Sequence, residues 1–132
     1  MREILFRGKR VDNGEWIEGY YYEELDGTHN IMTKESTGEY DGVQYYVPVE
    51  VIPETVGQYT GLDDKNGRKI FEWDVCKISI YGPEYIGFVD FYSGCFALDI
   101  SKTYGTEYAP CMYEFFEYEV IGNIHDKGFT AF

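Results

Sequence analysis

Three turn dipeptides constrain the fold of this chain more than any other feature, because each separates two runs that are rich in aromatic and β-branched residues. They are Asn13-Gly14, Asn66-Gly67 and Ser93-Gly94. Asn-Gly pairs tolerate the left-handed backbone conformations of tight hairpin turns, and Asn66-Gly67 fits a type I′ turn. The sequence therefore predicts antiparallel hairpins and an all-β fold.

Residues 1–50 are predicted to form an N-terminal β-hairpin region around the first turn. The stretch 34–42 is polar and lacks apolar periodicity, so we expect an exposed loop there. Pro48 cannot donate a backbone hydrogen bond. Residues 45–51 should therefore lie at a sheet edge or cross over between the two halves of the chain.

The stretch 51–78 organises the second half of the chain. Pro53 fixes its own φ angle, so residues 52–55 should form a turn or a short helical turn. Gly57 and Gly61 then bracket a short extended piece, and both are positions where a positive φ angle is expected.

A strand is predicted to follow Asn66-Gly67 and to run from Ile70 to Ile80. Its apolar residues change sides between Val75 and Ile78, which indicates a bulge or bend at that point.

Sustained amphipathic helix is missing from the sequence. Residues 101–110 fit a polar loop, and residues 111–119 fit either a helical face or a strand. We therefore expect a mainly β chain with at most one short helix. A composition shift near residue 50 divides it into the hairpin region and a small barrel or roll over 51–132, packed as one compact unit.

Charge and aromatic content restrict the partners. The chain carries 24 acidic and 11 basic residues, a net charge of −13, which repels nucleic-acid phosphates and anionic membranes. It also has 14 Tyr, 9 Phe and 2 Trp, more rings than one small core needs. Some rings should lie half-exposed on sheet faces or between subunits. The alternative is that Tyr serves simply as a good strand former.

The three cysteines are Cys76, Cys95 and Cys111, with no CxxC pair. The odd number and the lack of a secretory leader at the N-terminus predict buried free thiols in a reducing cytoplasm. No apolar run reaches the roughly 20 residues that span a membrane, so we expect a soluble cytoplasmic protein.

Several blocks of the sequence resemble the YopX family of phage and prophage proteins. They are REILFRGK (2–9) with GEW (14–16), TVGQYTGLDDKNG (55–67), IFEWDV (70–75) and EVIGNI (119–124). The resemblance implies a mainly β structure whose C-terminal part is similar to an SH3-like barrel, and a gene carried by temperate phage. It implies no reaction, because the family brings no catalytic residues. The chain departs from the family pattern at Trp73 and in the Tyr-rich stretch 20–46.

Two acidic patterns suggest chemistry. Residues 63–67 look like a calcium loop, but the EF-hand alignment puts Leu62 and Trp73 at positions that require carboxylates. Glu72 and Asp74 would lie about 7 Å apart on one face of a regular strand, a separation at which carboxylates can act as acid and base in sugar hydrolysis. We favour the alternative that one of them accepts backbone hydrogen bonds from the preceding turns.

Metal and nucleophile sites have little support. The three cysteines and His125 could form a Cys₃His zinc site only if the fold brought them together, and a Cys–His nucleophile pair has the same requirement. His29 is the only other imidazole, and the glycine motifs of phosphate sites and nucleophile elbows are missing. We therefore expect no enzyme, no bound metal and no cofactor.

The residues that stand out form a structural turn and strand motif: Thr55, Gly57, Tyr59, Thr60, Gly61, Asn66, Gly67, Glu72, Asp74 and Gly122. For function we expect a phage accessory protein that acts as a non-enzymatic protein-interaction or self-assembly module. Its partner would be a further copy of itself or a host or phage protein. The alternatives are an acidic nucleic-acid mimic that occupies a host DNA-binding protein, and a small-barrel nucleic-acid binder.

Overall fold

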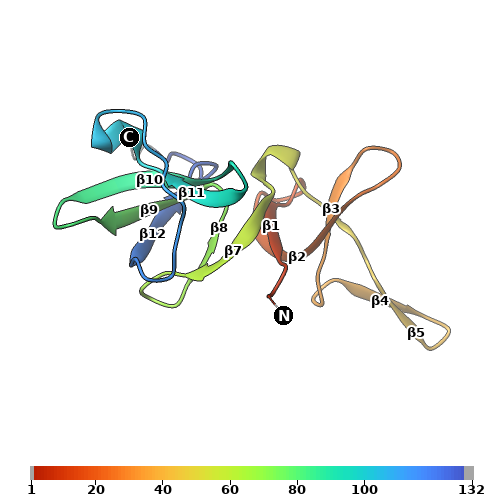
Figure 1. The fold of residues 1–132 in the computed structure, drawn as a ribbon. Helices are drawn as coiled ribbons and strands as arrows, with labels where there is room; N and C mark the ends of the chain where they lie inside the picture. Colours follow the sequence, from red (N-terminus) through yellow and green to blue (C-terminus); the bar gives the residue numbers. More distant parts are fainter. Residues whose placement is uncertain (1, 130–132) are drawn as a thin grey trace. The chain divides into compact units, whose positions relative to one another are not determined.

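β-strands dominate residues 2–129, the part of the chain that the computed structural model describes (Figure 1). The strands pair in antiparallel fashion, and one short α-helix, α1 (Ser101–Tyr104), accompanies them. The all-β prediction is therefore confirmed. The chain divides into two compact units, Met1–Gln58 (unit 1) and Tyr59–Phe132 (unit 2). The sequence suggested a boundary after residue 50.

Unit 1 is built on the predicted N-terminal hairpin. Its elements are β1 (Phe6–Lys9), β2 (Trp16–Glu23), β3 (His29–Met32), β4 (Thr37–Tyr40), β5 (Val43–Tyr46), β6 (Val49–Glu50) and the 3₁₀ turn η1 (Pro53–Thr55). β1 pairs with β2, β2 with β3, and β3 with β6. β6 lies at the sheet edge directly after Pro48, where a residue without an N–H is tolerated. η1 occupies the short turn predicted at 52–55.

The prediction of an exposed loop at 34–42 is wrong, because most of this stretch belongs to a hairpin. β4 and β5 pair from Thr37 opposite Tyr46 to Tyr40 opposite Val43. Asp41 and Gly42 connect them with φ angles of 51° and 78°, the two positive values that a type I′ turn needs. The sequence does contain an Asp-Gly pair at this turn. Apolar residues are frequent after the pair but not before it, so the pattern of two flanking strands is incomplete.

Unit 2 contains a four-stranded sheet in the order β11-β10-β9-β12 and the β7–β8 hairpin. The strands are β7 (Gly57–Asp63, beginning in unit 1), β8 (Lys69–Phe71), β9 (Asp74–Ser79), β10 (Glu84–Tyr92), β11 (Cys95–Asp99) and β12 (Tyr118–Asn123). Its core consists of Ile70, Cys76, Ile78, Val89, Leu98, Ile100, Tyr118 and Val120. The similarity to an SH3-like barrel stays a prediction.

The single strand predicted from Ile70 to Ile80 is wrong. β8 ends at Phe71 and β9 starts at Asp74, so the chain turns at Glu72 and Trp73 before the expected bulge. Trp73 has a φ angle of 73°, which is uncommon for a bulky residue. β8 pairs with β7 whereas β9 pairs with β10 and β12, so the turn moves the chain from one ladder to another.

The predicted hairpins form, but their turns differ in type. Only the glycine of Asn66-Gly67 has a positive φ angle, 81°, so the type I′ turn predicted there is wrong. Ser93-Gly94 has positive values at both positions, 51° and 82°, and joins β10 to β11.

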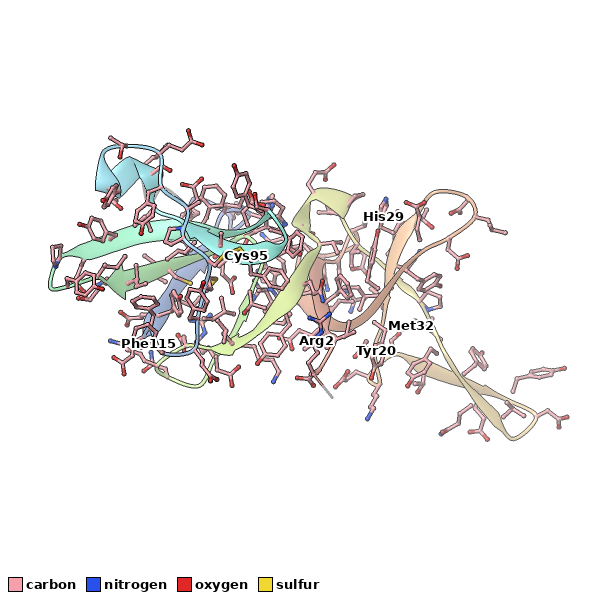
Figure 2. The ribbon with its side chains drawn as sticks, in the orientation of Figure 1. Arg2, Tyr20, His29, Met32, Cys95 and Phe115 are labelled. Carbon is pink, nitrogen blue, oxygen red and sulfur yellow. A yellow bond between two sulfur atoms is a disulfide. The ribbon has the colours of Figure 1, made fainter. Side chains whose placement is uncertain are left out.

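The prediction of three free thiols is wrong for two of them. Cys95 in β11 and Cys111 form a disulfide with a Cα–Cα distance of 6.0 Å, whereas Cys76 is a buried free thiol (Figure 2). Sixteen residues of separation gave no sign of this pairing in the sequence. Of residues 111–119, which fitted helix or strand, Tyr118 and Glu119 begin β12, and 111–117 are irregular apart from a bridge between Ala97 and Cys111.

Candidate interaction surface

Two residues of the predicted motif lie in unit 1, where they fix the end of η1. The hydroxyl of Thr55 accepts a hydrogen bond from the Lys9 backbone N–H at 2.9 Å and donates to the Ile52 carbonyl at 2.6 Å. Gly57 starts β7 and pairs with Arg7 of β1. Both positions hold backbone in place.

The next three motif residues shape the β7–β8 hairpin. Tyr59 donates its hydroxyl proton to Asp63 Oδ1 at 2.5 Å, and Thr60 donates to the Ile70 carbonyl at 2.8 Å. Gly61 has a φ angle of 85° and lies where the pairing of β7 with β8 changes register. A side chain would be strained at this irregularity.

Asn66 and Gly67 depend on Asp64, a residue that the sequence analysis did not select. The Asp64 side chain is only 6% exposed. Its Oδ1 accepts the backbone N–H groups of Asn66 and Arg68 at 2.9 Å each, and its Oδ2 accepts that of Val120 in β12 at 3.0 Å. The signal was an Asp at the start of a turn, a position from which its carboxylate bonds the backbone two residues on.

Electrostatics at Asp64 favour the charged form. Burial raises the pKa of Asp64, but the N–H groups of Val120, Arg68 and Asn66, together with the Arg68 charge, outweigh burial and hold the pKa below its ordinary value. Asp64 is therefore a structural anion that ties the turn to β12.

Asp74 has a similar structural role. It is 1% exposed, its Oδ2 accepts the Phe71 backbone N–H at 2.9 Å, and its Oδ1 accepts the Asn123 side-chain amide at 3.0 Å. Glu72 lies in the preceding turn, so the regular strand needed for a paired acid and base is interrupted. Gly122 lies at a bulge of β12, where an added Cβ would come within 2.6 Å of the Phe129 ring.

One side-chain cluster in unit 1 was missed from the sequence. The Tyr21 hydroxyl lies 2.5 Å from His29 Nδ1, and Glu23 lies 3.3 Å from His29 Nε2. Burial, followed by the charge of Glu23, raises the pKa of Tyr21. The register explains the cluster, because Glu23 pairs with His29 across β2 and β3 while Tyr21 is its diagonal neighbour.

The basic side chains near the predicted turns already contact neighbours in their own unit. Arg10 pairs with Asp12 at 2.7 Å, and Lys65 and Lys77 lie 3.7 and 3.9 Å from Glu119. Arg7 and Lys9 lie over the ring of Trp16, at 4.4 and 5.3 Å from its centroid. In these five residues the positive charge lies against a carboxylate or a ring of the same unit.

The β4–β5 hairpin, together with Ser36 and Val47 at its base, is a separate element of unit 1. We call residues 36–47 the arm. It forms its own two-stranded sheet, separate from the β6-β3-β2-β1 ladder, and extends away from the other strands of unit 1 (Figure 1). A two-stranded hairpin alone is at best marginally stable in water.

The arm is amphipathic. The pair Tyr40 and Val43, the pair Gly38 and Tyr45, and the pair Ser36 and Val47 share one side of it, because directly paired residues and alternate residues point the same way. The apolar members are exposed in the chain: Tyr40 by 79%, Val43 by 66%, Tyr45 by 51% and Val47 by 40%. The opposite side carries Thr37, Glu39, Gln44 and Tyr46.

Charge is distributed unevenly along the arm. The acids Glu39 and Asp41 lie at or near its tip, whereas Lys34 lies just before its base. Lys34 lines a hollow of about 440 Å³ together with Thr37, Gln44, Tyr45 and Tyr46. The neighbouring Glu35 accepts a hydrogen bond from the Thr33 hydroxyl, which lowers the pKa of Glu35.

Unit 2 exposes rings as well. Tyr81 lies in the β9–β10 turn, whereas Phe115, labelled in Figure 2, lies in an irregular turn with its ring centroid 4.5 Å from that of Phe116. The rings of Tyr104 and Tyr108 also contact each other, with 4.7 Å between centroids.

Two kinds of feature are missing from the described residues, a membrane-spanning helix and a metal-binding cluster. None of the helices in residues 2–129 is long and apolar enough to cross a membrane. Within the same residues, His, Cys, Asp and Glu side chains nowhere gather in threes suited to a metal ion.

Comparison with known proteins identifies one family. The family described as YopX protein matches residues 5–128, nearly the whole chain. No curated protein matches the chain. The matched region includes Asp64 and Asp74 with their hydrogen-bond partners, and it also includes the arm. The chain belongs to the YopX family.

Proposed function

We propose that this protein is a non-enzymatic protein-interaction or self-assembly module that makes contact through the arm. It would serve as an accessory protein of phage or prophage origin in the host cytoplasm, as the family resemblance implies. The observation that carries the proposal is the exposed apolar side of the arm, formed by Tyr40, Val43, Tyr45 and Val47.

The energetics favour burial of this side against another surface. Burying one large apolar side chain contributes about 1.5–3 kcal/mol, so a few such side chains supply a useful part of a binding free energy. A partner would also order the hairpin, which has no other sheet strand along its edges in unit 1.

The acidic side chains support a non-enzymatic role. The two most buried carboxylates, Asp64 and Asp74, accept hydrogen bonds from backbone or from Asn123. Asp12 and Glu119 pair with basic neighbours. Carboxylates that already have such partners are poorly suited to imitate a row of nucleic-acid phosphates. The alternative of an acidic nucleic-acid mimic therefore has less support.

The proposal is tested by replacing Tyr40 and Val43 with serine in one variant. We expect self-association, or retention of another protein, to weaken about 100-fold, because two apolar side chains no longer leave water. Sedimentation velocity over a wide concentration range measures self-association. Affinity capture from lysogenic cells measures retention of other proteins.

The matched control replaces two exposed apolar residues outside the arm, Val11→Ser with Leu25→Ser. The control should associate like the wild type, and circular dichroism should show the same strand content in all three proteins. Equal behaviour of the arm variant and the wild type in both assays would refute the proposal.

A further inference from the structure

We propose that the Cys95–Cys111 disulfide is a reversible redox latch for the connection between α1 and β12. When the bond is formed, this connection lies against β11, and reduction by a small thiol such as glutathione lets it open. We call residues 105–117 the strap. The inference concerns unit 2 and goes beyond the proposed function, which uses the arm of unit 1.

The disulfide fastens the middle of the strap to the sheet. Cys95 is the first residue of β11, and Cys111 lies in the strap, where it forms a bridge with Ala97 (Figure 2). Neither cysteine of the bond is buried. Because exchange requires a thiolate to reach one of the two sulfurs, this position makes the bond available to a small thiol.

The other contacts that hold the strap are weak. Among the residues that the structure describes, the strap includes no buried side chain, and Met112 and Phe116 pack against the core while remaining partly exposed. Backbone hydrogen bonds join the strap to β11. The Met112 N–H donates to the Phe96 carbonyl at 2.9 Å, and the Leu98 N–H donates to the Pro110 carbonyl at 3.0 Å. Each such bond adds little net stability, so loss of the disulfide should shift the strap toward an open state.

Both ends of the strap are fixed without the disulfide. The hydroxyl of Thr103 in α1 accepts a hydrogen bond from the Ile86 N–H and donates to the Ile86 carbonyl, each at 3.0 Å. Gly105 follows with a φ angle of 99°, which suits a hinge because glycine adopts such angles without strain. At the other end, Tyr118 belongs to the buried core. Reduction should therefore open the strap and leave the core folded.

The latch controls a hollow on the surface of unit 2. This hollow has a volume of about 320 Å³. Asp90 of β10 and Asp99 of β11 line it from the sheet, whereas Glu107 and Tyr108 line it from the strap. Opening of the strap removes one wall, so the redox state decides whether the hollow is formed.

The exchange consumes two molecules of the small thiol. The first thiolate attacks one sulfur, the Cys95–Cys111 bond breaks, a mixed disulfide forms and the released cysteine thiolate takes up a proton. A second thiolate attacks the mixed disulfide and leaves two protein thiols and one small-molecule disulfide. The reverse reaction closes the latch. Cys76 is 0% exposed and takes no part, so the bond re-forms between its original partners.

The cytoplasmic location in the proposed function favours a latch over a permanent cross-link. Disulfides are rare where thiols are kept reduced, and those that form there are mostly transient. This step alone rests on the proposed function. The exchange itself is tested on the pure protein, so its failure leaves the interaction proposal in place.

The test is hydrogen exchange, followed by NMR, on the full chain in an excess of either reduced or oxidised glutathione. The amides of Leu98, Ile100 and Met112 bridge β11 and the strap and therefore report its opening. We expect them to exchange about 100-fold faster in the reduced chain, the factor that corresponds to closing a loop of this length. Amides of β9, which pairs with β10 and β12, should remain the slowest. A return to oxidised glutathione should restore slow exchange.

Two variants serve as controls. Cys95→Ser with Cys111→Ser should exchange like the reduced wild type in both buffers, and Cys76→Ala should respond to glutathione as the wild type does. A bond that resists excess reduced glutathione in the folded chain would overturn the inference, as would equal protection of the three amides in both states. Loss of protection throughout β9 on reduction would also overturn it, because the bond would then hold the whole unit.

Discussion

Replacing Asp64 with alanine should lower the free energy of unfolding of unit 2 by about 4 kcal/mol, one of the two largest effects that we expect from this chain. Three backbone N–H groups, those of Asn66, Arg68 and Val120, donate to this carboxylate. A hydrogen bond to a charged group contributes about 1.5–3 kcal/mol, and a buried N–H without an acceptor is costly. The loss amounts to much of the stability of a small domain.

Urea titration checks this prediction. Fluorescence of Trp73 reports on unit 2 when the experiment is done in a Trp16→Phe background, since these are the two tryptophans of the chain. Asp64→Asn should cost about half as much, because the amide oxygen still accepts in the turn while the amide N–H₂ faces the Val120 donor. Asp63→Asn, at an exposed neighbour, should cost less than 1 kcal/mol. Equal costs for Asp63 and Asp64 would contradict the structural role.

The stabilisation by Asp64 should depend on pH in a defined direction. The pKa of Asp64 in the folded chain lies below its ordinary value of 3.8, so the folded state favours the carboxylate. The stabilisation is therefore fully present above the ordinary value and is lost as pH falls through the lower folded value. The stability difference between wild type and Asp64→Asn should be constant from pH 7 to about pH 5 and shrink below pH 4. A difference that grows on acidification would contradict this assignment.

Removal of the Cys95–Cys111 disulfide is the second large expected effect. The bond closes a loop with a sequence separation of 16, and the loop-entropy relation gives about 3 kcal/mol of stabilisation. Adding a thiol reductant, or replacing both cysteines with serine, should lower the stability of unit 2 by this amount. In a reducing cytoplasm the same loss would leave residues 101–111 held by hydrogen bonds, such as those of Leu98 with Pro110 and Ile100 with Tyr108.

The control for the disulfide is the serine double variant itself, whose stability should not respond to reductant. Thiol labelling provides a second readout. Burial, followed by the charge of Asp74, raises the pKa of the Cys76 thiol well above its usual value, so almost no reactive thiolate forms at neutral pH. The folded, oxidised chain should label slowly at every position, and the reduced chain should expose two thiols. Rapid labelling of two thiols without reductant would refute the pairing.

Some features of the fold could be predicted because local chemistry decides them. The turns at Asn13-Gly14, Asn66-Gly67 and Ser93-Gly94 were found because few residues other than glycine accept a positive φ angle. The motif residues Asn66 and Asp74 were singled out, but Asp64 was not. The partners of Asp64 include Val120, which lies 56 positions away in the sequence. No local sequence pattern indicates such a hydrogen bond.

The arm is a second feature that the local sequence pattern did not reveal. Its residues looked like a loop because a strand is recognised by the side that it buries, and the arm buries neither side against the rest of unit 1. Its amphipathic character became visible only when the register paired Tyr40 with Val43 and Gly38 with Tyr45.

The sequence by itself determined the all-β class, the main hairpins and the family, because these depend on residues that are neighbours in the chain. The tertiary structure alone decided the disulfide, the turn at Trp73, the anchoring of Asp64 to β12 and the exposed side of the arm. Each of these depends on which distant segments pack together, and packing selects among many partners that the local pattern leaves equally possible.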